Sequence, residues 1–347
     1  MRSLYMKKLI SALTFALCLA SAAAQTVDLS EWKKYLPEIH GTVRGKYEYQ
    51  TTTDEQRFQV RNARVSITGK VLPIVSYKAE IDLSDEGQIK MLDAYARVSP
   101  FKGWDFTVGQ MRVPFTIDAH RSPHQQYFAN RSFIAKQMGS LRDAGATVKY
   151  SQKEGFPFAL EAGLFSGSGL TEQKGWHKVL CYSAKLEMMP FKGYNLTLST
   201  QRVRPEQNNI YMYDAGTYYD WNNWHFEVEA MYKRYAHAAF DDVWSVDAFV
   251  NYDWWMKKPK SLVKKISFLA RFDYMGDSST GESDPDTGKL YITDYQRKRI
   301  TGGLTFSFGK PFQADLRLNY EKYFYDDLSF AKESEQDKLV VEMMVRF

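Results

Sequence analysis

Four basic side chains that can bind anions lie in one long polar connection of this chain. They are Arg121, Arg131, Lys136 and Arg142, set among His, Phe and Tyr residues. The connection separates two segments of alternating character, 104–112 and 143–150. A connection of this length inside a compact β protein is usually functional or disordered. Guanidinium and ammonium groups can bind oxyanions through charge-assisted hydrogen bonds, and the rest of the chain has to decide between a functional and a disordered connection.

Enzyme chemistry has little support in the residue pattern. His120 and His124 are four residues apart, but Pro123 lies between them, so no helix presents them as metal ligands. The acidic run 277–286 lacks the spacing of an EF-hand loop. Neither a GxSxG motif nor a phosphate-binding glycine loop occurs. We predict no catalytic residue, metal or cofactor, while a hydrolase embedded in a barrel wall stays open as an alternative.

The elements that must position the four bases have a period of two. In segment 41–50, Val43 and Tyr47 share one face, while Arg44 and Lys46 share the other. This is the pattern of strands with one apolar and one polar face. Sixteen such strands are predicted, at 41–49, 58–69, 71–83, 91–99, 104–112, 143–150, 156–165, 179–188, 194–202, 211–219, 224–234, 244–255, 262–274, 294–308, 312–323 and 338–347.

Alternation alone fits a soluble sandwich or a membrane barrel, and three features favour the barrel. The strands are long, their polar faces are strongly charged, and aromatic residues such as Trp104, Tyr219 and Trp254 gather near strand ends. Short Pro/Gly turns, among them PFKGW at 100–104 and PFKGY at 190–194, alternate with longer polar connections. The predicted fold class is therefore all-β, a transmembrane antiparallel β-barrel of about 16 strands.

The N-terminus predicts export. Residues 1–24 combine Lys7 and Lys8 with a short apolar run and a small-residue cleavage site, which indicates a signal peptide. Its removal lowers the formal net charge from +5 to +2, which argues against nucleic acid as a partner. Cys181 is then the only cysteine, so no internal disulfide is expected. Residues 25–40 are predicted as a short periplasmic segment, and 41–347 as the barrel.

The polar strand faces carry bases that are expected to line the pore. The candidates are Arg44, Lys46, Arg64, Lys78, Arg97 and Lys149, with Lys185, Arg271, Arg299 and Arg317 further along the chain. Arg and Lys on a pore wall favour anions and phosphate. Many carboxylates are predicted on the same faces, however. Whether the bases are clustered or paired with those acids is left open by the alternation.

Four landmarks in residues 57–145 resemble the phosphate-selective porin O and P family. They are a basic strand before Gly69-Lys70, the DAY strand at 93–95, GQMRVPF at 109–115 and RDAG at 142–145. The resemblance implies a sixteen-stranded, often trimeric channel whose third external loop folds inward and narrows the pore. The matching residues here lie between Pro114 and Arg142, so Arg121, Arg131, Lys136 and Arg142 are expected at the constriction. Arg142 with Asp143 could instead anchor the loop to the wall.

The predicted function is an outer-membrane porin that admits small anions by passive diffusion, phosphate or other oxyanions among them. A homotrimer in outer-membrane lipid is expected. The alternating last strand ends on Phe347, which resembles the signal read by the outer-membrane assembly machinery. The alternative is a structural or interaction barrel whose external loops bind a partner and whose pore conducts little.

Overall fold

The computed structural model describes residues 33–347 except 86–87, 138–140, 204–207, 259–260 and 310–312. The expected signal peptide and the first half of the segment 25–40, residues 25–32, lie outside the described residues. The strands are β1 (Glu38–Gln50), β2 (Gln56–Leu72), β3 (Val75–Asp85), β4 (Gln88–Val98), β5 (Trp104–Arg112), β6 (Arg142–Gln152), β7 (Phe158–Phe165), β8 (Cys181–Met188), β9 (Tyr194–Val203), β10 (Ile210–Trp221), β11 (Trp224–Tyr235), β12 (Val243–Trp255), β13 (Val263–Met275), β14 (Arg297–Phe308), β15 (Gln313–Tyr325) and β16 (Lys338–Arg346).

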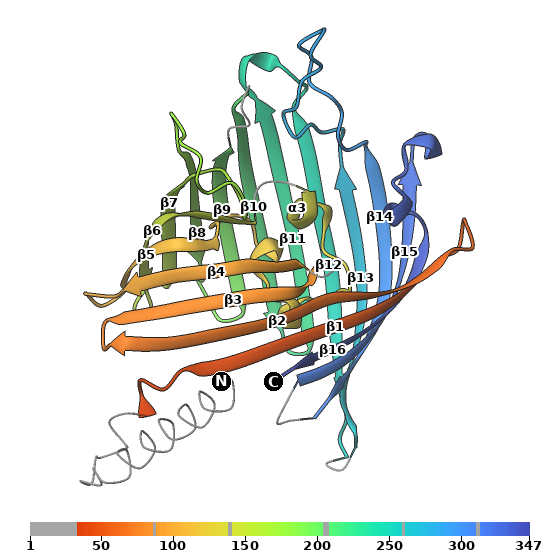
Figure 1. Cartoon of the computed structure of the whole chain (residues 1–347). Helices are drawn as coiled ribbons and strands as arrows, with labels where there is room; N and C mark the ends of the chain where they lie inside the picture. The colour runs from red at the N-terminus through yellow and green to blue at the C-terminus, as the bar shows by residue number, and fades with distance from the viewer. Residues whose placement is uncertain (1–32, 86–87, 138–140, 204–207, 259–260, 310–312) are drawn as a thin grey trace, which may run out of the picture.

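The sixteen strands close into one antiparallel barrel, as predicted (Figure 1). Each strand pairs with its neighbours in sequence, and β1 also pairs with β16. Thr42, for example, lies opposite Arg64 on one side and Arg346 on the other. Closure leaves no open sheet edge, which is the condition for a sheet to stand in lipid. The first strand begins at Glu38, three residues before the expected boundary at 41.

Burial is inverted relative to a water-soluble protein. The outward face carries exposed apolar side chains, such as Phe58 at 86 % and Val43 at 45 % of full exposure. The inward face carries buried charges, among which Glu229 and Glu321 are fully buried. An apolar exterior around a polar interior is the arrangement of a barrel in a bilayer. Among the described residues, no helix is long and apolar enough to cross a membrane.

Aromatic rings form contacts at both ends of the barrel. At the end where β1 begins, the ring centres of Trp104 and Tyr150 are 4.9 Å apart. At the opposite end, the ring centres of Tyr232 and Trp244 are 4.8 Å apart. Aromatic side chains with a polar edge collect where lipid meets water. The two sets of rings therefore mark the two membrane interfaces predicted from the positions of the aromatic residues.

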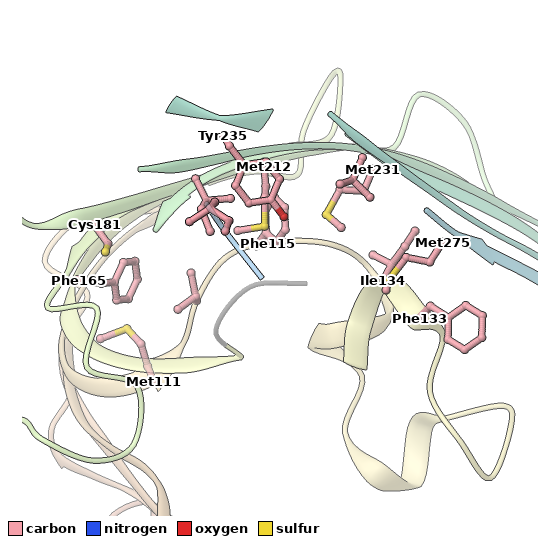
Figure 2. Packing of buried hydrophobic residues seen from close by; sticks show 14 of the residues in the cluster. Met111, Phe115, Phe133, Ile134, Phe165, Cys181, Met212, Met231, Tyr235 and Met275 are labelled. Atoms are coloured by element: carbon pink, nitrogen blue, oxygen red, sulfur yellow. The ribbon is translucent and has the colours of Figure 1, made fainter. Parts of the chain in front are cut away.

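The main apolar cluster lies inside the barrel and holds the long loop, defined here as residues 113–141 between β5 and β6. This loop contains the short helix α3 (Phe133–Gln137) and the 3₁₀ turns η1 (Asp118–His120) and η2 (Pro123–Gln125). Its side chains pack against inward-facing residues of the wall (Figure 2). The cluster includes Val113, Phe115, Phe133 and Ile134 from the loop, with Met111, Phe165, Met212, Met231 and Met275 from the strands.

Candidate functional site

A cavity of about 410 Å³ lies between the long loop and one side of the barrel wall. Arginines of the wall and of the loop line it: Arg44, Arg61, Arg64, Arg131 and Arg142. Its other lining residues come from β2, β4, the long loop and the connection between β7 and β8. The cavity thus collects guanidinium groups from segments that are far apart in the sequence.

The long loop is held in place by the inward-facing side chains of several strands. The backbone N–H of Thr116 donates to Ser199 Oγ of β9 at 3.0 Å, and that of Ile117 donates to Glu229 of β11. Further along, the Ala129 N–H donates to Asn319 Oδ1 of β15 at 2.8 Å. Unpaired backbone donors in a buried segment are costly, so these wall acceptors stabilise the loop against the inner face of the barrel.

Arg121 is tied to the wall through a carboxylate. Its Nη1 donates to Glu227 Oε1 at 2.7 Å, and its Nη2 donates to Glu227 Oε2. The guanidinium also lies 5.1 Å from the ring centre of Tyr127 and 5.6 Å from that of Phe249. Burial alone would lower the pKa of Arg121, but Glu227 raises it above its usual value. The charge of Arg121 is therefore compensated, and its position is determined by Glu227.

Arg131 is bound mainly by backbone carbonyls. Its Nη2 donates to the Arg121 carbonyl at 2.6 Å and its Nη1 donates to the Asp118 carbonyl. These acceptors satisfy N–H groups but carry no formal charge. Burial lowers the pKa of Arg131 to about 10, with Asp118 opposing the shift and other arginines adding to it. Arg131 therefore stays protonated at neutral pH and keeps its positive charge at the cavity.

Arg142 is a wall-anchored residue. Its Nε donates to Asp93 Oδ1 at 2.7 Å, and its Nη2 donates to Glu80 Oε1 at 3.2 Å. Asp143, the expected partner, instead accepts from the N–H of Ala144 at 2.8 Å. Arg142 is thus anchored to the wall by Asp93 and Glu80, and not by the Asp143 considered from the sequence. The remaining candidate of the loop, Lys136, lies in α3, and its side chain is outside the described part of the structure.

Most bases predicted on the pore wall are paired with carboxylates. The pairs are Arg44 with Glu342 (2.9 Å), Lys46 with Glu48 (2.6 Å), Arg64 with Asp82 (2.9 Å), Lys78 with Asp93 (2.6 Å) and Lys149 with Glu161 (3.8 Å). Arg97 differs, since its Nε donates to Thr107 Oγ1 at 3.1 Å. Such pairing reduces the net charge of the wall, so the wall bases form a mixed polar surface.

Sequence reasoning missed Arg61, because it assumed one unbroken alternation along β2. The register of β1 and β2 pairs Arg44 with Asn62 and then Gly45 with Val60, which leaves Arg61 as the extra residue of a β-bulge. A bulge changes the direction of side chains, and Arg61 lines the cavity next to Asn62. The sequence does carry a sign of the bulge. The apolar residues of the strand have even numbers at Phe58 and Val60 but odd numbers from Val65 onward.

A second bulge lies on β4, two strands away. Glu80 of β3 pairs with Asp93 and Ile81 pairs with Met91, so Leu92 is the extra residue. Gln110 of β5 fixes this bulge, since its Nε2 donates to the Leu92 carbonyl at 2.8 Å and to the Met91 carbonyl at 2.5 Å. Leu92 also lines the cavity. Gln110, which belongs to the GQMRVPF motif, thus has a physical role beside the site.

Two arginines of the cavity lack a salt bridge to any described residue. Within the described part of the chain, neither Arg61 nor Arg131 forms a salt bridge with a carboxylate, whereas Arg44, Arg64 and Arg142 each do. An unpaired guanidinium with free N–H donors attracts anions. The cavity can therefore attract and hydrogen-bond an anion without first breaking an ion pair.

Comparison with known proteins gives one family and many similar folds. The family model of phosphate-selective porin O and P matches residues 35–246. No curated protein sequence matches the chain. Three similar solved structures are the anion-selective porin from Comamonas acidovorans (10% identity, covering 90% of this chain and 98% of that chain, TM-score 0.61), the outer membrane channel DcaP of Acinetobacter baumannii (15%, 90% and 96%, 0.59) and Salmonella typhi OmpF in complex with daunomycin (11%, 90% and 98%, 0.60). At these identities the likeness shows the fold.

Proposed function

Since this chain belongs to the phosphate-selective porin O and P family, we propose that its pore prefers small anions. The chain is an outer-membrane porin, a closed barrel through which small solutes diffuse passively. The preference for anions is what we propose beyond this passive diffusion. It rests on the two unpaired arginines, Arg61 and Arg131, at one cavity beside the long loop. Positive charge on a pore wall favours anions, provided each site is weak enough to release them.

The long loop forms the constriction in this proposal. Arg131 supplies charge to the passing anion, while Arg121 and Arg142 hold the loop and wall through Glu227, Asp93 and Glu80. Lys136 is assigned to the constriction from its place in the loop. The wall bases Arg44, Lys46, Arg64, Lys78, Arg97 and Lys149 contribute a polar lining with little net charge of their own.

Export and assembly complete the proposal. Residues 1–24 are proposed as the signal peptide and 25–40 as the short periplasmic segment, whose last residues, 38–40, belong to β1. Phe347 is about half exposed, and its backbone exchanges hydrogen bonds with Gly41 at the closing seam (2.8 and 3.1 Å). That position suits a terminal signal for the assembly machinery. The barrel stands in outer-membrane lipid as a homotrimer, and no catalytic step is involved in transport.

The reversal potential of the purified protein in planar bilayers under a potassium chloride gradient tests the preference. We expect an anion-preferring potential for the wild type and a shift toward cation preference in R61Q/R131Q. The matched control is R234Q, because Arg234 lies on an exposed position of β11. An unchanged potential in R61Q/R131Q would contradict the proposal, and a barrel that conducts no current would favour the interaction barrel.

A further inference from the structure

We infer that the arginine-lined cavity binds organic anions with an apolar body, such as short-chain carboxylates, in preference to inorganic oxyanions. The inference rests on the proposed function and narrows it to a class of solute. It starts from the composition of the cavity, which has a cationic and an apolar part. Leu92, Leu141 and Leu170 line it together with Arg61 and Arg131.

The apolar part of the cavity is separate from the apolar clusters inside the barrel. Leu92 is only 5 % exposed, yet it belongs to neither of the two apolar clusters found among the described residues. It faces inward because it is the extra residue of the β4 bulge, beside the buried Asp93. The other two leucines come from separate segments, Leu141 from the end of the long loop and Leu170 from the β7–β8 connection. Three independent segments thus supply apolar surface to one cavity.

Inorganic and organic anions need different surroundings. The oxygens of phosphate point in all directions, so any of them that faces a leucine is left without a donor, and an unpaired acceptor is costly. A carboxylate on an alkyl chain has its oxygens at one end and apolar carbons at the other. Its oxygens can accept from Arg61 and Arg131 while its chain contacts Leu92 and Leu170. The lining therefore matches an amphipathic anion.

The size of the cavity agrees with this class. At about 410 Å³ it lies within the range of pockets that bind small organic molecules, which are mostly apolar with a few placed polar groups. The remaining arginines already have carboxylate partners, since Arg44 pairs with Glu342 and Arg142 with Asp93. An anion thus meets two guanidinium groups that have no salt bridge to the described residues, and not five. Weak binding of this kind permits release, as passage through a pore requires.

Block of the chloride current in planar bilayers tests the inference. Acetate, butyrate and hexanoate carry the same single charge at pH 7 and differ only in apolar length. We expect the half-blocking concentration to fall along this series, by up to about fourfold for each fully buried methylene. Inorganic phosphate should need a higher concentration than hexanoate. In L92S/L170S the three carboxylates should block at similar concentrations.

Two further variants keep the test decisive. L170S alone alters a loop residue and covers the case in which Leu92→Ser prevents folding; it should weaken the dependence on chain length. L180S is the matched control, because Leu180 precedes β8 in the same connection but does not line the cavity. Phosphate blocking as well as hexanoate, or an unchanged chain-length dependence in L170S and L92S/L170S, would overturn the inference. If the wild-type pore still prefers chloride, the proposed function survives that result.

Discussion

Arg61 and Leu92 are each the extra residue of a β-bulge, and both line the same cavity. Their strands, β2 and β4, lie on either side of β3 in the barrel. A regular strand places every second side chain inward, so a bulge is a way to add one inward side chain without changing the outer face. One bulge adds a cation here and the other adds an apolar group.

The β4 bulge is predicted to depend on Gln110. In Q110L the carbonyls of Met91 and Leu92 lose their donor, and leaving the buried Leu92 carbonyl unsatisfied costs about 1–3 kcal/mol. We expect Q110L to unfold at a lower temperature than the wild type, which semi-native gels show as a shift of the band. Block of the chloride current by carboxylates should also depend less on their chain length. Q59L is the control, since Gln59 is exposed. Equal stability of Q110L and the wild type would show that the bulge is held by other contacts.

We predict that Arg142 contributes more to the stability of the barrel than to the ion selectivity of the pore. R142Q leaves Asp93 and Glu80 with one fewer cationic partner, and breaking a buried ion pair typically costs about 3–5 kcal/mol. Thermal unfolding in detergent should show a large loss, and R142Q/D93N should recover part of it. Current recordings of folded R142Q should still show anion preference. A stable R142Q pore with a reversed preference would contradict this assignment.

Gly109 is predicted to be intolerant of any side chain. Its φ is +130°, and a Cβ there would meet the Ala94 carbonyl oxygen at 2.2 Å. G109A should therefore disrupt the pairing of β4 with β5 and lower the free energy of unfolding by more than about 2 kcal/mol. The folded fraction should fall accordingly. G45A is the matched control, because no atom lies within 4 Å of a Cβ at Gly45. Refolding yields in detergent micelles compare the two, and similar yields would rule out this close approach.

A lower pH is predicted to weaken the contact between the long loop and β16 at His124. Its Nε2 accepts from Arg346 Nη1 at 2.6 Å, which requires the neutral ring. Burial, with Arg346, Arg112 and Arg317 nearby and Glu80 opposing, lowers the pKa of His124 from 6.5 to about 4. Between these values the unfolded chain binds the proton and the folded chain does not, so stability falls as pH drops from about 6.5 to 4.

The pH prediction is checked by thermal unfolding in detergent at pH 7.5, 6, 5 and 4. H124Q keeps an acceptor for Arg346 but does not titrate, so it should lose less stability than the wild type over this range. H177Q serves as the control, since His177 lies in the exposed β7–β8 connection. Parallel pH curves for the wild type and H124Q would assign the acid sensitivity to other groups.

The barrel, its strand count and the face that each regular strand turns to lipid could all be predicted from the sequence. All sixteen predicted strands are present, and Arg44 and Lys46 are buried inward while Val43 is exposed outward. These features are readable because alternation is local: a residue and its second neighbour decide the face between them. The length and polarity of the 113–141 connection were equally visible, since they need no knowledge of distant residues.

Which of the bases are paired with carboxylates could not be predicted from the sequence. Arg142 meets Asp93 and Glu80, which are 49 and 62 positions away, and Arg121 meets Glu227, 106 positions away. Arg131 meets carbonyls instead. Such pairings depend on strand register and on where the loop lies in the barrel, and a composition with nearly balanced charge allows many of them. Ion pairing is a non-local property, so the unpaired guanidinium groups emerge only once the barrel is closed and the loop is in place.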